Sequence, residues 1–327
     1  MKYLVTGGAG FIGSHLTESL IAEGHHVTVI DDYSTGSPEN LATIKDSPSL
    51  DIVEGDILNL PELEYLISRS DMVFHLAAAV GVELVVHDPV KTISINVHGT
   101  EAVLKGAERK GTKVLLASTS EVYGKSEKKE FSETDDLLIG PPMRSRWSYA
   151  SSKLLDEFLG MAYYKAQKLP VIIVRLFNTV GPRQTGRYGM VLPRFVSKAL
   201  AGEPIEVYGD GEQTRCFCHV ADTVRALKLL PGADSAVGRV FNIGSTEQVS
   251  INGLARRVIE RLGSKSQMKH IPYEQAYEPG FEDMLHRFPN IAQMKKMTGW
   301  SPVHTLDQII DTTADFYRKN PNHRKSR

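Results

Sequence analysis

Short apolar runs alternate with amphipathic segments along the first half of this 327-residue chain. The runs are rich in Val, Ile and Leu and have the length of buried strands, namely residues 2–6, 26–31, 51–54, 72–76, 113–118 and 171–175. The segments between them repeat apolar residues at helical spacing, most clearly at 90–110 and 148–165. This alternation predicts an α/β fold in which about six parallel strands are covered by helices.

The amino-acid composition of the sequence changes after Asn178. Glycine, proline and arginine gather at 181–183 and again at 186–189, a composition typical of loops over a binding site. We therefore expect a first domain over residues 1–177 and a smaller, substrate-covering domain over 178–318. The apolar run at 239–243 predicts a strand that returns to the first sheet, so the domains should interleave. The basic residues 319–327 are expected to form a mobile tail.

The composition narrows the classes of protein to consider. Lys and Arg number 38 against 39 Asp and Glu, so the net charge of −1 does not favour nucleic acid or an anionic membrane as the main partner. No run approaches the ~20 apolar residues that a bilayer requires, and the chain starts directly in a strand rather than a signal peptide. We expect a cytoplasmic protein with a large core.

Two cysteines, Cys216 and Cys218, precede His219 and raise the question of a metal site. Structural zinc usually takes four ligands, and the sequence shows no second cluster of Cys and His. Strand alternation would place both thiols on one face. We expect reduced, partly buried cysteines and no metal.

The N-terminal segment carries a glycine-rich turn between a strand and a helix. Gly8-x-Gly10-x-x-Gly13 follows the first apolar run, and the next strand ends about 20 residues later at Asp31. Glycines at these positions let a pyrophosphate approach the backbone at the positive end of the helix. A carboxylate at the end of the second strand accepts the ribose hydroxyls and repels a 2′-phosphate, which favours NAD over NADP. Asp32 follows directly and is a second candidate for this role.

Tyr149 and Lys153 are four residues apart on a predicted helix and therefore share one face. An ammonium near a phenol lowers the pKa of the phenol, so Tyr149 could take a proton from a hydroxyl near neutral pH. Alone, this spacing more often describes a packed tyrosine beside a solvated lysine. Its occurrence after a dinucleotide turn makes the catalytic interpretation the stronger one.

Five motifs together resemble the extended short-chain dehydrogenases/reductases that modify nucleotide sugars. They run in order over nearly the whole chain: Gly7-Gly8-Ala9-Gly10-Phe11-Ile12-Gly13, His75-Leu76-Ala77-Ala78, Ser118-Thr119-Ser120-Glu121-Val122-Tyr123-Gly124, Tyr149-x-x-x-Lys153 and Asn178-x-x-Gly181-Pro182-Arg183. The resemblance implies a Rossmann-type doubly wound parallel sheet with a smaller C-terminal α/β substrate-binding domain. It also implies a homodimer that pairs the helices near 90–110 and 148–165 with their copies.

The resemblance further implies a reaction that begins with oxidation of a hexose at C4 by tightly held NAD. Tyr149 would take the C4 hydroxyl proton, Lys153 would hold the cofactor ribose, and Thr119 would hydrogen-bond the same hydroxyl. The family pattern lends cofactor contacts to Gly7, Gly10, Phe11, Ile12, Gly13, Asp31, Asp32, Asp56, Ile57, Leu76, Ala77, Ala78, Asn96 and Ser118. It lends contacts with the nucleotide diphosphate to Asn178, Val191, Arg194, Val207, Tyr208 and Arg215.

Two of these assignments have an equally good structural alternative. Val207 and Tyr208 also fit a short packed strand, because their segment alternates apolar and polar residues. Arg215 is the firmest diphosphate contact, since a guanidinium fork suits two phosphates.

Glu121 separates the branches of the family. Sugar 4-epimerases commonly have a small residue there, whereas a carboxylate supplies the second acid or base that chemistry at C5 needs. Ser120 stands where the dTDP-glucose dehydratases have an aspartate, and Asp31 argues against the GDP-mannose dehydratases, which generally use NADP. The decarboxylases of UDP-glucuronate keep the Thr119-Ser120-Glu121 triplet.

Two further segments resemble the UDP-glucuronate decarboxylases. Arg146-Trp147-Ser148-Tyr149 resembles their approach to the catalytic tyrosine, and Arg287, in the segment 286–291, resembles an arginine that contacts substrate or donates a proton. We therefore expect UDP-glucuronate decarboxylation to UDP-xylose or its 4-keto form. A surface salt bridge is the plain alternative for Arg287.

Other functions remain open at this stage. A UDP-sugar 4-epimerase shares the Gly181-Pro182-Arg183-Gln184 segment, and an NDP-sugar 4,6-dehydratase is a further alternative. A regulatory NAD-sensing protein would lack Tyr149 or Lys153, and a simple alcohol dehydrogenase would release NADH on each turnover. The sequence therefore favours an enzyme that returns its hydride within one turnover.

Overall fold

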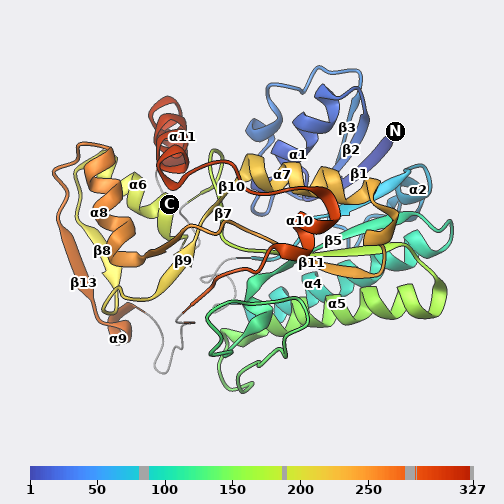
Figure 1. The fold of residues 1–327 in the computed structure, drawn as a ribbon. Coiled ribbons are helices and arrows are strands. Elements are labelled where there is room, and N and C mark those ends of the chain that lie inside the picture. Colours follow the sequence, from blue (N-terminus) through green and yellow to red (C-terminus); the bar gives the residue numbers. More distant parts are fainter. Residues whose placement is uncertain (81–87, 186–189, 277–283, 285, 325–327) are drawn as a thin grey trace.

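A seven-stranded parallel sheet forms the centre of the protein in a computed structural model, with the strand order β11-β6-β5-β4-β1-β2-β3 (Figure 1). The model describes residues 1–80, 88–185, 190–276, 284 and 286–324, so the glycine-rich run at 186–189 lies outside the described residues. The strands are β1 (Lys2–Thr6), β2 (His26–Asp31), β3 (Leu50–Glu54), β4 (Met72–His75), β5 (Lys113–Thr119), β6 (Val171–Leu176) and β11 (Arg239–Ile243). The predicted doubly wound sheet is confirmed, and the returning strand β11 pairs with β6 as expected.

The direction of winding reverses at β1. This strand pairs with β2 on one side and with β4 on the other, so the loops after β1 and β4 leave the same edge of the sheet on either side of a crevice. Open α/β sheets bind ligands in this crevice. The glycine turn follows β1, and Thr119 ends β5 at the same edge.

One face of the sheet is covered by α1 (Phe11–Ala22), α7 (Val220–Leu229) and α10 (Ala292–Thr298). Leu16 of α1 and Leu227 of α7 are fully buried in the apolar core on this face. A helix far along the chain therefore completes the core that the N-terminal helix begins.

The opposite face is covered by α2 (Leu63–Ser68), α4 (Pro89–Glu108) and α5 (Trp147–Gln167). Helices α4 and α5 lie below the sheet in Figure 1. Ile67 and Leu104 are fully buried in a second core there. The inner side of α5 faces the carboxyl end of β5, and this arrangement brings the Tyr149 helix to the crevice.

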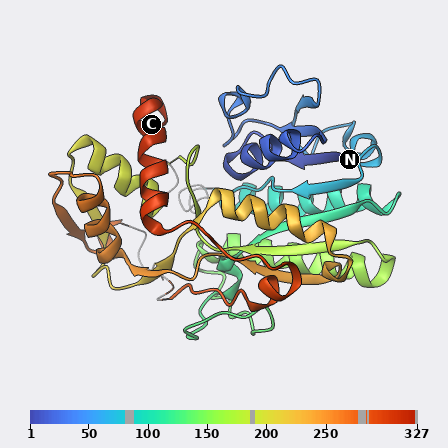
Figure 2. The ribbon, with the colours of Figure 1, turned by 45° about the horizontal axis from the view of Figure 1, so that its top comes forward.

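A smaller α/β domain stands beside the sheet (Figure 2). Phe195, Leu254 and Ile310 are fully buried in its separate apolar core. Its helices are α6 (Val191–Ala201), α8 (Ile251–Arg261) and α11 (Leu306–Lys319), and its strands are β8 (Ile205–Tyr208) with β13 (Met268–Ile271) and β9 (Thr214–Cys216) with β12 (Gln248–Ser250).

Short elements connect these layers. They are β7 (Thr179–Val180), β10 (Cys218–His219), the 3-10 turns η1 (Pro38–Leu41), η2 (Ser120–Tyr123), η3 (Leu230–Gly232) and η4 (Asp234–Ala236), and the helices α9 (Tyr273–Ala276) and α12 (Pro321–Arg324). The cysteines do not share one strand as predicted, because the ladder breaks at Phe217. Cys216 pairs with β12, whereas Cys218 pairs with β7.

The C-terminal segment, predicted to be a basic, mobile tail, is helical as far as residue 324, and residues 325–327 lie outside the described residues. Lys319 is the last residue of α11, and α12 continues the helical structure to residue 324. Asn320 caps α11 through its side chain on the Phe316 carbonyl at 3.0 Å, and the His323 ring packs edge-on against the Phe316 ring. These local contacts order a segment whose charge alone suggested a tail.

None of the helices in the described part of the chain has both the length and the apolar character needed to span a bilayer.

Candidate active site

In the glycine turn after β1, the backbone lies very close to neighbouring backbone atoms of the turn itself and of the loop after β4. Gly7 has a φ of +70°, and a Cβ there would lie 2.8 Å from the Ala77 nitrogen. A Cβ on Gly13 would lie 2.1 Å from the Gly7 carbonyl oxygen, so α1 can start against the turn only with glycine at this position. Gly10 precedes the first residues of α1, Phe11 and Ile12. The turn and the free amides of the α1 N-terminus form the cradle that a dinucleotide pyrophosphate requires.

Asp31 is the carboxylate that faces this turn. Its Oδ2 accepts the Ala9 amide and its Oδ1 accepts the Tyr33 amide, both at 2.9 Å. Burial raises the pKa of Asp31, while these backbone donors lower it. Asp32 is exposed and accepts hydrogen bonds from Ser34 instead. Of the two candidates, Asp31 is therefore the one that lies against the glycine turn, where the cofactor ribose is expected.

The other predicted cofactor residues surround the same crevice. Asp56 closes its own turn by accepting the Leu58 amide at 2.9 Å, and the next residue, Ile57, is buried against α4. Asn96 of α4 is buried and holds Ala79 in both directions, by its Oδ1 on the amide at 2.8 Å and by its Nδ2 on the carbonyl at 3.3 Å. Asn96 thus shapes the loop that continues from Leu76, Ala77 and Ala78.

Tyr149 and Thr119, both predicted to contact the C4 hydroxyl of the sugar, lie side by side. The Thr119 hydroxyl makes a hydrogen bond with the Tyr149 phenol. Burial raises the pKa of Tyr149 well above its ordinary value, the carboxylates of Glu121 and Asp156 act in the same direction, and Thr119 and Arg287 oppose them. The net shift is opposite to the lowering that the Tyr-x-x-x-Lys spacing predicts. The main physical reason is burial of the phenol. In addition, Lys153 donates to Asp156 at 2.6 Å, so a carboxylate accompanies the ammonium that the spacing places near Tyr149.

Glu121 lies between two arginines. Its Oε1 is 2.5 Å from Arg287 Nη2, and its Oε2 is 3.2 Å from Arg146 Nη2. The arginine side chains are only 11% and 10% exposed, respectively, so the surface-salt-bridge alternative for Arg287 is wrong. Ser120 is buried at the first position of η2, between Thr119 and Glu121. The structure therefore joins the predicted catalytic residues into one group at the end of β5.

The predicted diphosphate residues divide into two kinds. Arg215 is buried on β9 and donates to the Thr214 carbonyl at 2.8 Å, and the Asn178 amide donates to the Cys216 carbonyl at 3.0 Å. Both side chains are fixed where the smaller domain meets the sheet. Val207, in contrast, is fully buried in the core of the smaller domain, so its side chain packs in that core as the strand alternative predicted.

Arg194 and Tyr208 form a pair at the start of the smaller domain. The Arg194 guanidinium lies 4.0 Å from the Tyr208 ring centroid and donates to the Glu206 carbonyl at 3.1 Å. Val191 begins the helix that carries Arg194. A cation stacked on an aromatic ring offers a polar edge to an anionic or ring-shaped ligand.

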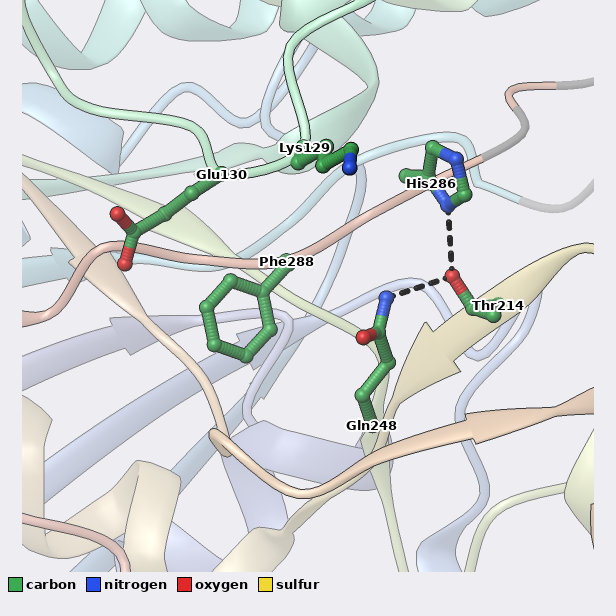
Figure 3. Close-up of a pocket in the computed structure, with 6 residues that line it drawn as sticks. All are labelled: Lys129, Glu130, Thr214, Gln248, His286 and Phe288. Atoms are coloured by element: carbon green, nitrogen blue, oxygen red, sulfur yellow. Dashed lines mark hydrogen bonds between the residues drawn. The ribbon is translucent and has the colours of Figure 1, made fainter.

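A pocket of about 450 Å³ lies behind the Arg287 segment (Figure 3). His286 and Phe288 line it, whereas Arg287 between them pairs with Glu121. Thr214 accepts Gln248 Nε2 at 2.7 Å and bonds His286 Nδ1 at 2.9 Å, as the dashed lines in Figure 3 show. Lys129 and Glu130 complete the lining. These contacts hold the backbone on either side of Arg287 and so fix its approach to Glu121.

The cysteines are free and buried, and burial raises the pKa of each thiol to about 12. No group of three or more His, Cys, Asp or Glu side chains suited to a metal occurs among the residues that the structure describes.

Sequence reasoning missed several residues of the site. Asp156 follows Lys153 by one helical turn, a spacing that could have suggested an ion pair. Glu157 accepts the Ser118 hydroxyl at 2.6 Å and pairs with Arg175 at 2.8 Å, both buried. Arg175 comes from a strand 18 residues later in the sequence, so no local pattern could have shown this contact.

The fold, the glycine turn and the Tyr149 helix define an extended short-chain dehydrogenase/reductase. A family model described as GDP-mannose 4,6 dehydratase matches residues 4–313, and the chain belongs to this family of nucleotide-sugar enzymes.

Relatives include proteins of several activities. The chain is 40% identical over 98% of its length to 99% of the "UDP-N-acetyl-alpha-D-glucosaminuronate decarboxylase" of Bacillus cytotoxicus. It is 35% identical over 98% of its length to 73% of the "UDP-glucuronic acid decarboxylase 1" of Xenopus tropicalis. Among solved structures, the UDP-glucuronic acid 4-epimerase of Bacillus cereus, in complex with UDP-glucuronic acid and NAD, superposes with a TM-score of 0.87 at 28% identity, over 98% of this chain and 99% of that chain.

Proposed function

We propose that this protein is an NAD-dependent decarboxylase of a UDP-linked hexuronate that works through a 4-keto intermediate, with UDP-glucuronate as the first substrate to test. The observation that carries the proposal is Glu121 held by Arg287 beside the Tyr149 phenol. An acid/base and a cation at this place suit a sugar that bears a carboxylate at C5. The two decarboxylase relatives support the same reaction.

The residues fit NAD at the crevice. The glycine cradle accommodates a pyrophosphate, Asp31 suits a ribose diol without a 2′-phosphate, and the solved epimerase of this fold holds NAD. Bound NAD supplies the hydride acceptor for C4. Tyr149 and Lys153 would lie beside its nicotinamide ribose, where Lys153 can donate to a hydroxyl.

The proposed mechanism uses Tyr149 first. With Thr119 orienting it, Tyr149 in its phenolate form would take the proton of the C4 hydroxyl while C4 gives up its hydride, and C4 becomes a ketone. The sugar is then a β-keto acid. The bond between C5 and the carboxyl carbon breaks, CO₂ leaves, and the electron pair enters the C4 ketone as an enolate that takes a proton at C5. Arg287 can stabilise the developing negative charge, and Glu121 can act as an acid/base at C5.

A 4-epimerase is the second candidate, because a solved 4-epimerase of UDP-glucuronate has the same fold over the whole chain. Epimerisation needs the ketone to turn over and does not need Glu121. The 4,6-dehydratase alternative rests on the family match and on fold likeness alone.

Proton NMR of the protein with UDP-glucuronate separates these candidates. We expect loss of the C5 uronate signal and appearance of UDP-xylose or its 4-keto precursor. A parallel sample with UDP-N-acetylglucosaminuronate tests whether the substituent at C2 decides the substrate. Conversion to UDP-galacturonate with the carboxylate retained would refute the decarboxylase proposal and support the epimerase.

A homodimer is part of the proposal. Side chains of α4 and α5 that face away from the sheet leave apolar surface exposed, with Val90 77% and Phe158 65% accessible, next to Ile93 and Leu155. The two helices pack against each other, and a second copy of the chain could cover the apolar residues that both expose. Light scattering should give the mass of a dimer, and Phe158→Asp should give a monomer. A wild-type monomer would refute this assembly.

The cytoplasmic location stays a prediction.

A further inference from the structure

Asp156 is a buried carboxylate that the proposed reaction does not yet use. Its side chain is 0% exposed, and its Oδ2 lies 2.6 Å from the ammonium of Lys153, which is 3% exposed. The pair spans one turn of α5 on the side that also carries Tyr149. A pair of opposite charges placed this deeply needs a specific arrangement to offset the cost of removing both charges from water.

The groups around the pair come from three further elements. Burial raises the pKa of Asp156, and Lys153 and the hydroxyl of Thr100 of α4, which lies beside the carboxylate, oppose that rise. His75 of β4 bonds Thr100 by Nε2 at 3.1 Å and Thr6 of β1 by Nδ1 at 2.7 Å. Burial lowers the pKa of His75 to about 3, and the Lys153 charge acts in the same direction, so His75 is neutral at physiological pH.

These contacts have a consistent direction of donation. The Ala77 amide donates to Thr6 Oγ1 at 3.3 Å, which leaves the Thr6 hydroxyl to donate to His75 Nδ1. His75 Nε2 can then donate to Thr100, whose hydroxyl points toward Asp156. Oδ1 of Asp156 has no hydrogen-bond partner within normal distance among the described residues, so Thr100 lies near without making a regular bond. The chain of polar groups ends at a carboxylate that also receives Lys153.

Asp156 competes with Tyr149 for the charge of Lys153. A free ammonium four residues from a phenol on one helix face stabilises the phenolate, whereas an ammonium paired at 2.6 Å with a carboxylate does so much less. Burial disfavours the phenolate most, the carboxylates of Glu121 from η2 and of Asp156 act in the same direction, and Thr119 from β5 and Arg287 oppose them. Glu157 is the next carboxylate on α5, but it is paired with Arg175.

We propose that Asp156 is a positioning residue: its buried pair with Lys153 fixes the ammonium and limits how strongly Lys153 stabilises the phenolate of Tyr149. Tyr149 must also return its proton to the sugar when the C4 ketone is reduced. A phenolate that is stabilised less strongly gives a phenol that holds its proton until this step, so that Tyr149 can act as both base and acid. The inference rests on the proposed role of Tyr149 as the proton acceptor at C4.

Asp156→Asn tests the proposal because it removes the charge and keeps the shape. The acid limb of the pH profile of kcat/KM should move to lower pH by about one unit, since one opposing charge near the phenol is worth roughly this much. Asp156→Glu keeps a carboxylate and should stay near the wild-type profile. Glu157→Gln is the matched control: it breaks a neighbouring buried pair, so it should lower the thermal midpoint without moving the acid limb.

Two further measurements keep the test decisive. If Asp156→Asn does not fold, Thr100→Val should give a smaller shift in the same direction, because the ionised carboxylate loses its neighbouring hydroxyl. Ultraviolet titration of the phenol, taken as the difference between the NAD-loaded protein and its Tyr149→Phe variant, reports on Asp156 without any substrate. An inactive wild type with a shifted phenol titration in Asp156→Asn would refute the proposed function and keep this inference. An unchanged titration in a folded Asp156→Asn would overturn the inference.

Discussion

The candidate active site has two halves that are held differently. In the cofactor half, which includes Lys153 and Asp156, side chains from β1, β4, α4 and α5 bind partners that are themselves buried. In the sugar half, Glu121 of the η2 turn pairs with Arg287 of a coil segment. Lys153 and Asp156 lie within one helix, and Glu157 meets Arg175 beneath Ser118. Glu121 instead meets Arg287, which lies more than 160 residues later in the sequence. The first half is set by the packing of the sheet. The second depends on how one coil segment is held.

This contrast suggests a division of labour. Proton and hydride chemistry at C4 requires a rigid arrangement, which buried pairs on regular elements provide. Choice of the sugar and of the reaction at C5 lies on segments that can change without disturbing the sheet. Relatives with the same fold but different activities, such as decarboxylases and a 4-epimerase, agree with this division.

Tyr149→Phe should have the largest effect. Loss of a positioned acid/base typically costs about 10²–10⁴ in rate, and we expect about a 10³-fold fall in kcat for conversion of UDP-glucuronate, followed by NMR. Because the ring is kept, binding of NAD measured by calorimetry should stay within a few-fold of wild type. A variant that retains a tenth of the activity would show that Tyr149 is not the proton acceptor.

Arg175→Met should be the most destabilising change in the cofactor half. It leaves Glu157 charged and buried without its partner, a situation that costs about 3–5 kcal/mol in the free energy of unfolding. Urea denaturation measures this loss, and the double variant Arg175→Met/Glu157→Leu should recover most of it.

A surface pair supplies the matched comparison for Arg175. Arg261 and Asp311 pair at 2.6 Å on the outside of the smaller domain, and both side chains are well exposed. Arg261→Met should leave the urea midpoint almost unchanged. Equal losses in the two variants would remove the contrast between buried and exposed pairs.

Arg287→Gln tests the sugar half. The variant keeps a hydrogen-bond donor but loses the charge, so kcat/KM for UDP-glucuronate should fall about 10–100-fold, as for loss of a charged hydrogen bond. The unfolding free energy should change little, because Arg287 lies in a coil. His286→Gln, on the pocket side of the same segment, should cost less activity. If Arg287→Gln unfolds the protein instead, the sugar half is as structural as the cofactor half.

His75→Gln should have the smallest effect, which appears only on acidification. The pKa of His75 is lowered to about 3 in the folded protein, so below pH ~6.5 the unfolded chain takes a proton that the folded protein refuses. The wild type should therefore lose about 2 kcal/mol of stability from this group between pH 7 and 5, and the variant should not. Urea midpoints at both pH values measure this difference.

The exposed His26 is the control for His75. It pairs with Asp51 at the surface, so His26→Gln should leave the acid sensitivity as it is in the wild type. Identical pH slopes for wild type and His75→Gln would show that another group causes the acid sensitivity.

The sheet, the glycine turn and the preference for Asp31 over Asp32 could be predicted from the amino-acid sequence, as could the place of Thr119 and Tyr149 at one edge of the sheet. Each of these depends on local spacing: alternation of strand and helix, glycine where a Cβ would collide, and residues at the carboxyl ends of parallel strands. The return of residues 239–243 to the sheet could also be predicted from the sequence, because a short run of β-branched and aromatic residues suits a buried parallel strand.

The partners of the charged side chains around the site could be known only from the tertiary structure. Val207 lies in the core of the smaller domain, and residues 321–324 form a helix. Lys153 pairs with Asp156 as well as lying on the helix face of Tyr149. The contacts of Glu121 with Arg287 and of Glu157 with Arg175 join distant segments, and no local pattern encodes them. Burial changes the energy of a charge by more than any neighbour in the sequence does, so the direction of the Tyr149 pKa shift followed from packing.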